Sequence, residues 1–110
     1  MENFSELLSR ESMRKSEVVE RLMSNAEAVR ALGATSLYLF GSVARDEAEP
    51  ASDIDVFIDY DPLGRFHAFD LISIKLMLEE KLAASVDITT RDGPHPRLRS
   101  KIEKSALQVF

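Results

Sequence analysis

The chain has 110 residues, a 45% hydrophobic fraction, no cysteine and a formal net charge of −5. This length predicts a single domain, residues 1–110, with a modest core. The lack of cysteine excludes disulfides and thiolate chemistry, and the acidic balance argues against direct nucleic-acid binding by neutralisation of phosphates. No run approaches the ~18 apolar residues of a membrane span, and no signal-peptide core follows Glu2 and Glu6, so we expect a cytoplasmic protein without membrane association.

The first third of the chain has the periodicity of a helix. Apolar side chains recur at three- and four-residue spacing from Val18 to Leu32, and Gly33 follows where a helix would end. Residues 4–8 carry a shorter apolar turn, which predicts a separate helix packed across the first one.

Two strands follow, with a short helix between them. Residues 35–40 form a compact apolar run rich in strand formers, and Gly41-Ser42 closes it. Ser42 is a suitable N-cap for a short helix that reaches about Ala48. Residues 54–60 predict the second strand.

The last part of the chain repeats the alternation of helix and strand. Residues 69–82 trace a helix with a broad apolar face, and residues 85–90 form a third strand. After the break at 93–96, Leu98, Ile102 and Leu107 predict a final short helix. The order indicates an α/β (α+β) domain, in which helices flank a small mixed sheet of about three strands.

Three carboxylates occupy related places on these strands. Side chains alternate along a strand, so Asp53 and Asp55 point to one side and Ile54 points to the core. Two such carboxylates repel each other unless a cation or proton lies between them. Asp87 repeats the pattern on the third strand. If the strands are neighbours, three acids converge on a site that suits magnesium, which binds through a few carboxylates and substrate phosphates.

Gly41 and Ser42 supply a complementary phosphate site. A glycine between strand and helix lets the backbone approach a phosphate closely, and the helix start offers free N–H groups. The Ser42 hydroxyl adds a donor. The phosphate and metal sites lie one strand-turn apart, as phosphoryl or nucleotidyl transfer with two metals about 4 Å apart requires.

Other interpretations of Asp-x-Asp fit this sequence less well. Taken alone, the pair is more often a solvated edge or loop feature. A calcium loop needs an oxygen ligand at the fifth position and glycine at the sixth, where this chain has Phe57 and Ile58. A sugar-nucleotide glycosyltransferase needs more room than 110 residues provide. The joint occurrence of Gly-Ser, Asp-x-Asp and a later acid favours nucleotidyl transfer.

This combination resembles the minimal nucleotidyltransferases of the polymerase-β-like superfamily. Gly41-Ser42, ten intervening residues, Asp53-Ile54-Asp55 and Asp87 follow the family's pattern, over a stretch from about residue 35 to the C-terminus. The resemblance implies that the three acids bind two Mg²⁺ ions and that Asp87 helps to activate the acceptor hydroxyl. It also implies that Gly41 and Ser42 hold the β- and γ-phosphates of the nucleotide.

One position departs from the family's pattern. Family members often have glycine where this chain has Asp46. We expect the added negative charge near the phosphates to reduce nucleotide affinity, while the acids at 53, 55 and 87 remain intact.

Stand-alone members of this length resemble the antitoxins encoded beside HEPN-type ribonuclease toxins. The resemblance implies transfer of AMP from ATP to a tyrosine of the toxin, and a hetero-oligomer of the two proteins. Two alternatives stay open. One is a non-catalytic antitoxin that neutralises the toxin by binding alone, and the other is an antibiotic-type nucleotidyltransferase that modifies small molecules.

The remaining charged residues have less specific interpretations. Arg45 either contacts a phosphate or forms a salt bridge to an acid on an adjacent element. From residue 91 to 104 there are five basic residues against two acids, and from 46 to 61 there are seven acids and no base. Three of these bases are Arg97, Arg99 and Lys101. They would either steer a triphosphate or a partner, or form a solvated helix face, and the solvated face is the simpler expectation.

The histidines and three of the aromatic residues are given no part in the chemistry. His67 and His95 have no second ligand at metal spacing, so no role is assigned to them. Phe40, Phe66 and Phe69 are expected in the core.

Overall fold

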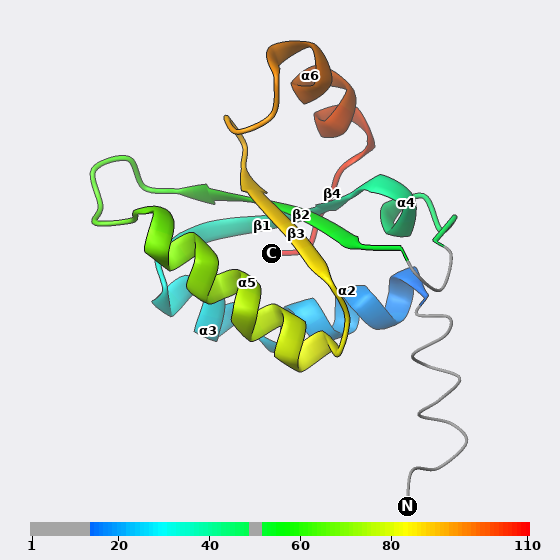
Figure 1. The fold of residues 1–110 in the computed structure, drawn as a ribbon, viewed down its shortest axis with the longest axis horizontal. Coiled ribbons are helices and arrows are strands. Elements are labelled where there is room, and N and C mark those ends of the chain that lie inside the picture. Colours follow the sequence, from blue (N-terminus) through cyan, green and yellow to red (C-terminus); the bar gives the residue numbers. More distant parts are fainter. Residues whose placement is uncertain (1–13, 49–51) are drawn as a thin grey trace, which may run out of the picture.

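A four-stranded mixed sheet forms the centre of the domain (Figure 1). The structure is a computed structural model, and it describes residues 14–48 and 52–110. The strands are β1 (Ala34–Phe40), β2 (Ile54–Tyr60), β3 (Val86–Thr90) and β4 (Leu107–Gln108), in the spatial order β3-β2-β1-β4. β2 is antiparallel to β1 and parallel to β3, while β4 is antiparallel to β1. The mixed α/β class is confirmed, with four strands in place of about three.

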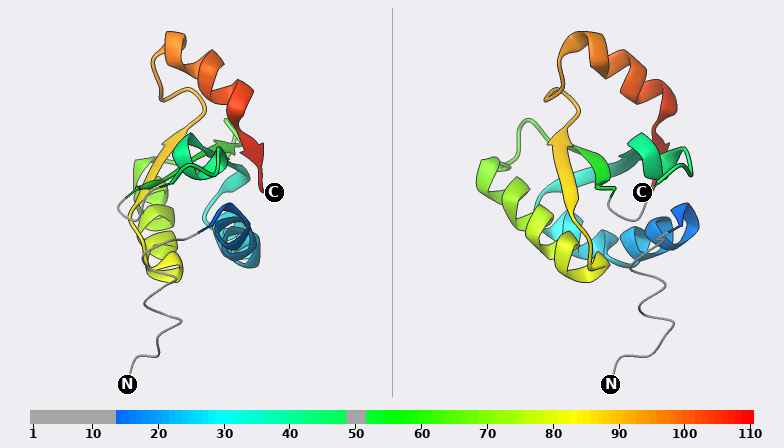
Figure 2. Two further views of the ribbon diagram at one scale, coloured as in Figure 1. Left: turned by 90° about the vertical axis from the view of Figure 1, so that its right-hand side faces the viewer. Right: turned by 45° about the vertical axis from the view of Figure 1, so that its right-hand side comes forward.

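The helices are distributed unequally over the two faces of the sheet. α2 (Lys15–Ser24), α3 (Ala26–Ala31) and α5 (Ala68–Leu82) lie on one face, and α6 (Pro96–Ser105) lies beyond the other (Figures 1 and 2). The face covered by α2, α3 and α5, here called the inner face, therefore holds the core. The opposite, outer face remains available for a site.

The first helical region consists of two helices where a single one was expected. The break is at Asn25, whose side-chain amide donates to the Arg21 carbonyl at 2.8 Å. Asparagine competes in this way with the backbone's own hydrogen bonds, which favours a break. Gly33, with φ of 111°, ends the region as predicted. The helix expected at residues 4–8 lies outside the described residues.

The helix after β1 is shorter than predicted. α4 spans Gly41–Ala44 with Phe40 as its N-cap, so the expected N-cap at Ser42 and end near Ala48 are both wrong. The last residue of β1, Phe40, is extended, with φ of −139° and ψ of −172°, and takes the cap position itself, so the helix begins at Gly41, one residue before Ser42.

α5 is confirmed, but it presents apolar side chains on two faces. Ile74 and Leu78 are fully buried, whereas Phe69 is 76% exposed. Nine residues at about 100° per residue place Phe69 opposite Leu78 on the helix. The expectation that Phe69 belongs to the core is therefore wrong, whereas Phe66 packs against the core's edge.

The C-terminal strand was not predicted. α6 ends at Ser105, Ala106 is extended, and Leu107 pairs with Leu39 in β4 where the sequence analysis placed it in a helix. The return of the chain to β1 carries Val109 into the core, at 7% exposure. A two-residue strand has no periodicity from which it could be recognised.

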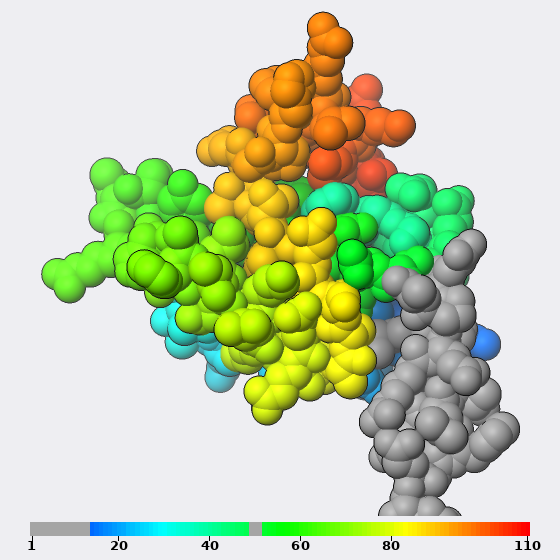
Figure 3. Space-filling model, viewed as in Figure 1, coloured from blue at the N-terminus to red at the C-terminus, as the bar shows by residue number. Residues whose placement is uncertain are grey.

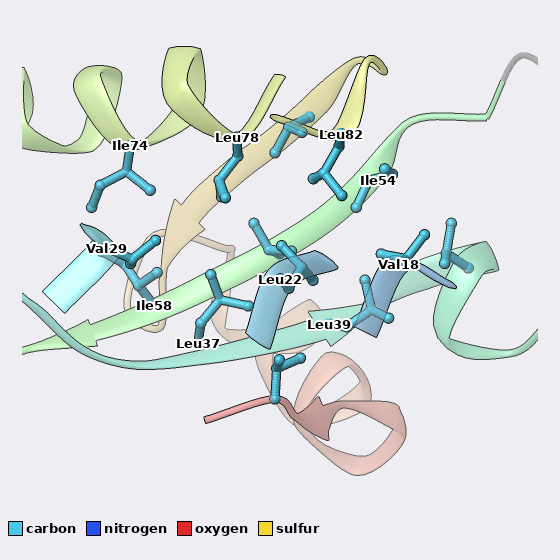
Figure 4. Packing of buried hydrophobic residues seen from close by; sticks show 14 of the residues in the cluster. Val18, Leu22, Val29, Leu37, Leu39, Ile54, Ile58, Ile74, Leu78 and Leu82 are labelled. Carbon is cyan, nitrogen blue, oxygen red and sulfur yellow. The ribbon is translucent and has the colours of Figure 1, made fainter. Parts of the chain in front are cut away.

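The core lies between the sheet and the helices on its inner face (Figure 4). Ile54 points into it, as strand alternation predicted. None of the helices in the described residues is long and apolar enough to span a membrane. The core's largest fully buried members come from both strands and helices: Val18, Leu22, Val29, Leu37, Leu39, Val56, Ile58, Ile74, Leu78 and Leu82.

Candidate active site

The turn at the end of β1 lies directly against an acid of β2. Phe40 pairs with Asp55 in the antiparallel ladder, which places Gly41 beside the Asp55 side chain. Gly41 has a φ of 75°, a conformation that side-chain-bearing residues rarely adopt. A Cβ on Gly41 would also overlap Asp55 Oδ2 and lie 3.1 Å from its Cγ. Glycine is therefore required here both by backbone conformation and by space.

The parallel ladder places a second acid on the other side of Asp55. Asp55 pairs with Asp87 on β3, and Asp53 lies just before β2 on the same face of the chain. Asp55 is half-buried, while Asp53 and Asp87 are exposed. The two strands are neighbours, as the predicted site required, and Asp55 lies between the Gly41 turn and Asp87.

The environment of Asp55 disfavours its ionised form. Burial raises the pKa of Asp55 most, and the negative charges of Asp87 and Asp53 raise it further. The nearby Arg45 lowers that pKa in part. Like charges gathered at one point attract a cation, because a cation removes the repulsion that a proton would otherwise relieve.

The donor set fits a magnesium ion that shares its coordination with a ligand. In residues 14–48 and 52–110, no three acidic, histidine or cysteine side chains are close enough to hold an ion by themselves. Asp55 and Asp87 nevertheless provide oxygen donors on paired positions, next to a glycine turn. Magnesium usually keeps water and phosphate oxygens among its ligands, so a few carboxylates suffice.

α4 ends in a hydrogen-bonded turn that explains the glycine common in the family. The Glu47 N–H donates to the Ser42 carbonyl at 2.8 Å, and the Asp46 N–H donates to the Val43 carbonyl at 3.0 Å. This pair of bonds is a Schellman motif, in which the residue at position 46 is left-handed and usually glycine. Asp46 adopts that conformation with φ of 58°. A glycine at position 46 would therefore fit this helix end without strain.

Arg45 pairs within its own turn. Its Nε lies 3.1 Å from Glu47 Oε2, with both side chains more than half exposed. This pair differs from the expected salt bridge to an adjacent element, and contact of Arg45 with a phosphate stays a prediction. Such an exposed pair contributes little stability, so Arg45 is able to exchange Glu47 for an anionic ligand.

A second charged cluster, which the sequence analysis did not identify, lies farther along the outer face. Arg91 donates to both carboxylate oxygens of Asp59, at 2.7 and 2.8 Å, and to Glu103 on α6 at 3.2 Å. Its guanidinium lies over the rings of Tyr38 and Phe57, at 4.8 and 5.1 Å from their centres. The hydrogen bonds that Arg91 donates to Asp59 raise the pKa of Arg91 above its ordinary value. This cluster joins α6 to the sheet and neutralises Asp59, which alternation alone would group with Asp55.

Both histidines have structural positions that sequence reasoning missed. His67 is the N-cap of α5, and its backbone N–H donates to Asp70 Oδ2 at 3.0 Å. His95 is the N-cap of α6, and its Nδ1 accepts from the Arg97 N–H at 3.2 Å. Residues just before a predicted helix are the signal that would have indicated these caps.

The basic residues of α6 do not form one uniform face. Arg97 and Lys101 are exposed, as the expectation of a solvated face predicted. Arg99 is half-buried, and its Nη2 donates to the Asp92 carbonyl at 3.3 Å. Figure 3 shows α6 standing out from the body of the domain.

Comparison with known proteins places this site in a family. The model of the nucleotidyltransferase domain family matches residues 22–109. A protein of Methanocaldococcus jannaschii named "Putative protein adenylyltransferase" is 38% identical over 72 residues, which are 66% of this chain and 75% of the relative. A second protein with that description from the same organism is 34% identical over 76 residues, 67% of this chain and 74% of its own.

Solved structures share the fold. A structure described as a "putative minimal nucleotidyltransferase" matches with a TM-score of 0.66 and 35% identity, over 81% of this chain and 93% of its own. A complex described as a tri-AMPylated Shewanella oneidensis HEPN toxin with its MNT antitoxin has a chain that matches with a TM-score of 0.60. That match has 16% identity over 84% of this chain and 71% of the other. At this identity the second likeness concerns the fold alone.

Proposed function

The chain belongs to the nucleotidyltransferase domain family and is a nucleotidyltransferase, and we propose that it transfers AMP from ATP to a tyrosine hydroxyl of a HEPN-type ribonuclease toxin. The observation that supports this most is the position of Asp55, between the glycine turn at Gly41 and its paired acid Asp87. The turn suits phosphates and the acids suit cations, so a nucleoside triphosphate with its metal fits across β1, β2 and β3.

In the proposed reaction, each feature of the site has a part. Gly41 and Ser42 bind the β- and γ-phosphates, and Asp53 and Asp55 would hold two Mg²⁺ ions, which would neutralise phosphate charge. Asp87 is the third acid; it would share in holding the ions, and it orients the acceptor hydroxyl and accepts its proton. The hydroxyl oxygen forms a bond to the α-phosphorus, the bond between that phosphorus and the bridging oxygen breaks, and pyrophosphate leaves.

The choice of a protein acceptor rests on the relatives. The M. jannaschii relatives are described as protein adenylyltransferases, and one fold neighbour is an antitoxin bound to an AMPylated toxin. The acids at 53 and 87 are exposed, which suits a large acceptor that completes the site. We include a hetero-oligomer with the toxin, and a cytoplasmic location where ATP is available, in the proposal.

Mass spectrometry of a co-expressed toxin tests the proposal. A HEPN-type toxin, sought among the proteins encoded beside this chain, is purified after co-expression with wild type, Asp55→Asn or Asp87→Asn. Asp92→Asn, which changes an exposed acid just beyond β3, is the matched control. We expect whole-AMP increments on a toxin tyrosine with wild type and the control, and none with the two site variants.

The same experiment separates the alternatives. An unmodified toxin that still co-purifies with wild type and is neutralised by Asp55→Asn would replace enzymatic transfer with binding alone. Labelled nucleotide found on small hydroxylated acceptors, with none on the toxin, would indicate the antibiotic-type activity.

A further inference from the structure

A side chain of α5 makes a direct hydrogen bond to the start of the strand that carries Asp87. Glu79 Oε2 accepts the backbone N–H of Val86 at 3.0 Å, across seven residues of sequence. Val86 is the first residue of β3 and immediately precedes Asp87. Both Glu79 and this bond are partly buried.

The packing around Glu79 restricts where its carboxylate can lie. Leu78 and Leu82, on either side of it along α5, are fully buried, and α5 packs against β3. Figure 3 shows the C-terminal half of α5 and β3 side by side on the face in view. Apolar contacts thus fix the position of α5, and the backbone that carries the Glu79 carboxylate is fixed with it.

β3 needs such a contact more than the other strands of the site. Among the strands of residues 14–48 and 52–110, it is an edge strand with β2 as its one neighbour. It is joined to β2 in parallel, so no tight hairpin sets its register. Near its start, the Ile54 N–H donates to the Ser85 carbonyl at 2.9 Å. The Glu79 bond to the Val86 N–H holds the opposite side of the strand. The two hydrogen bonds therefore fix β3 from both sides just before Asp87.

We propose that Glu79 is a positioning residue, which holds the start of β3 so that the Asp87 carboxylate stays opposite Asp55. The inference rests on the proposed function, because it assigns the position of Asp87 a part in metal binding and transfer. Glu79 touches neither nucleotide nor acceptor in this role. Its contribution is the acceptor oxygen, so glutamine, which retains a carbonyl oxygen at the same place, substitutes for it.

The test compares Glu79→Ala and Glu79→Gln with wild type, and Glu80→Ala is the matched control at an exposed neighbouring glutamate. Hydrogen exchange of the Val86 amide reports the bond itself. Titration with Mn²⁺ reports the assembled acids, and toxin modification gives kcat and KM. Residues that support metal ligands typically change metal affinity or activity by about 10- to 100-fold when removed.

We expect Glu79→Ala to lose Val86 protection and weaken Mn²⁺ binding by about 10- to 100-fold. Its kcat should fall by a similar factor with little change in KM, while Glu79→Gln and Glu80→Ala stay within about threefold of wild type. Thermal melting by circular dichroism establishes that each variant is folded at the assay temperature. Should Glu79→Ala unfold there, Glu79→Met, which keeps the length of the side chain, takes its place.

Two results would overturn the inference. One is wild-type Mn²⁺ affinity and transfer in a folded Glu79→Ala whose Val86 amide has lost protection. The other is equal damage in Glu79→Gln and Glu79→Ala, which would mean that charge matters and the acceptor oxygen does not. A wild-type chain that transfers no nucleotide refutes the proposed function instead, and the Val86 exchange and Mn²⁺ titrations still decide the role of Glu79.

Discussion

Replacement of Gly41 by alanine tests the central contact of the site. Gly41 has a φ of 75°, and its missing Cβ leaves room for the Asp55 carboxylate. Alanine would therefore strain the backbone and also displace a side chain that we assign to metal binding. Gly33→Ala is a matched control, because Gly33 has a φ of 111° and its Cβ would meet Phe66 Cδ2 at 2.9 Å, away from the acids.

The expected loss of stability combines three terms. A left-handed conformation costs a non-glycine residue about 1–2 kcal/mol. Moving Asp55 off its rotamer costs about 0.5–1.5 kcal/mol more. Alanine also restricts the unfolded chain, which offsets about 0.4–1 kcal/mol. Mid-range values lower the free energy of unfolding by about 2 kcal/mol, or the Tm by about 8 °C in a domain of this size.

The two contributions separate in a double-mutant cycle. Removing the carboxylate with Asp55→Ala abolishes the overlap and leaves the backbone strain of Gly41→Ala. Urea unfolding of the four proteins should therefore show a coupling free energy of about 1 kcal/mol between positions 41 and 55. For Gly33→Ala and Asp55→Ala, the two effects should add.

Activity provides the functional half of this prediction. A displacement of about 1 Å in a catalytic group commonly reduces the rate by about 100-fold. We expect a loss of that size in toxin modification by Gly41→Ala at a temperature where it is folded, and no comparable loss for Gly33→Ala. Additivity of Gly41→Ala with Asp55→Ala to within about 0.3 kcal/mol, or wild-type transfer by Gly41→Ala, would refute the reasoning.

Three further predictions concern charge and helix ends. Because the folded pKa of Asp55 is raised, its contribution to stability is present at acid pH and is lost as pH rises through that pKa. Asp55→Asn should therefore raise the free energy of unfolding near pH 7 by about 0.2–1 kcal/mol, and melting curves should show this gain vanish as pH falls toward the ordinary value of 3.8. Asp46→Gly should raise the free energy of unfolding by about 0.5–1 kcal/mol, because it relieves left-handed strain, and the Tm should rise with it; it should also lower the KM for ATP. An unchanged Tm contradicts the assignment of this helix end. Arg91→Ala should cost about 1–2 kcal/mol in urea unfolding, because it leaves Asp59 and Glu103 without their shared partner, with partial exposure limiting the effect; a loss below about 0.5 kcal/mol would show that α6 is held by other contacts.

Local patterns in the sequence were sufficient for the parts of the fold that depend on one element at a time. Alternation placed Asp53 and Asp55 on the face opposite Ile54, because the period of two is a property of the strand itself. Strand and helix spacing located β1, β2, β3 and α5 to within a few residues. The neighbouring position of Asp87 was not available from periodicity, since strand order depends on how the elements pack; the family resemblance supplied it.

The features that escaped prediction depend on contacts between distant residues or on single side chains. Arg91 and Asp59 are 32 residues apart, and no local pattern connects them. The break between α2 and α3 depends on one amide, that of Asn25. β4 exists because the chain after α6 returns to Leu39, which is a tertiary pairing with no signal in its two residues. α5 carries apolar side chains on two faces, so hydrophobicity alone did not show that Phe69 lies on the exposed one.

The order of the strands explains why the pieces of the site meet at all. β2 lies between β1 and β3, so Asp55 has the Gly41 turn on one side and Asp87 on the other. The antiparallel pairing brings the end of β1 next to the start of β2, and the parallel pairing brings the start of β3 next to the start of β2 as well. If β3 were antiparallel to β2, the end of β3, with Thr90, would lie beside the start of β2, and Asp87 would lie farther from the phosphate turn. The helical crossover through α5 is thus what makes the third acid available, and Glu79 lies at the end of that crossover where β3 begins.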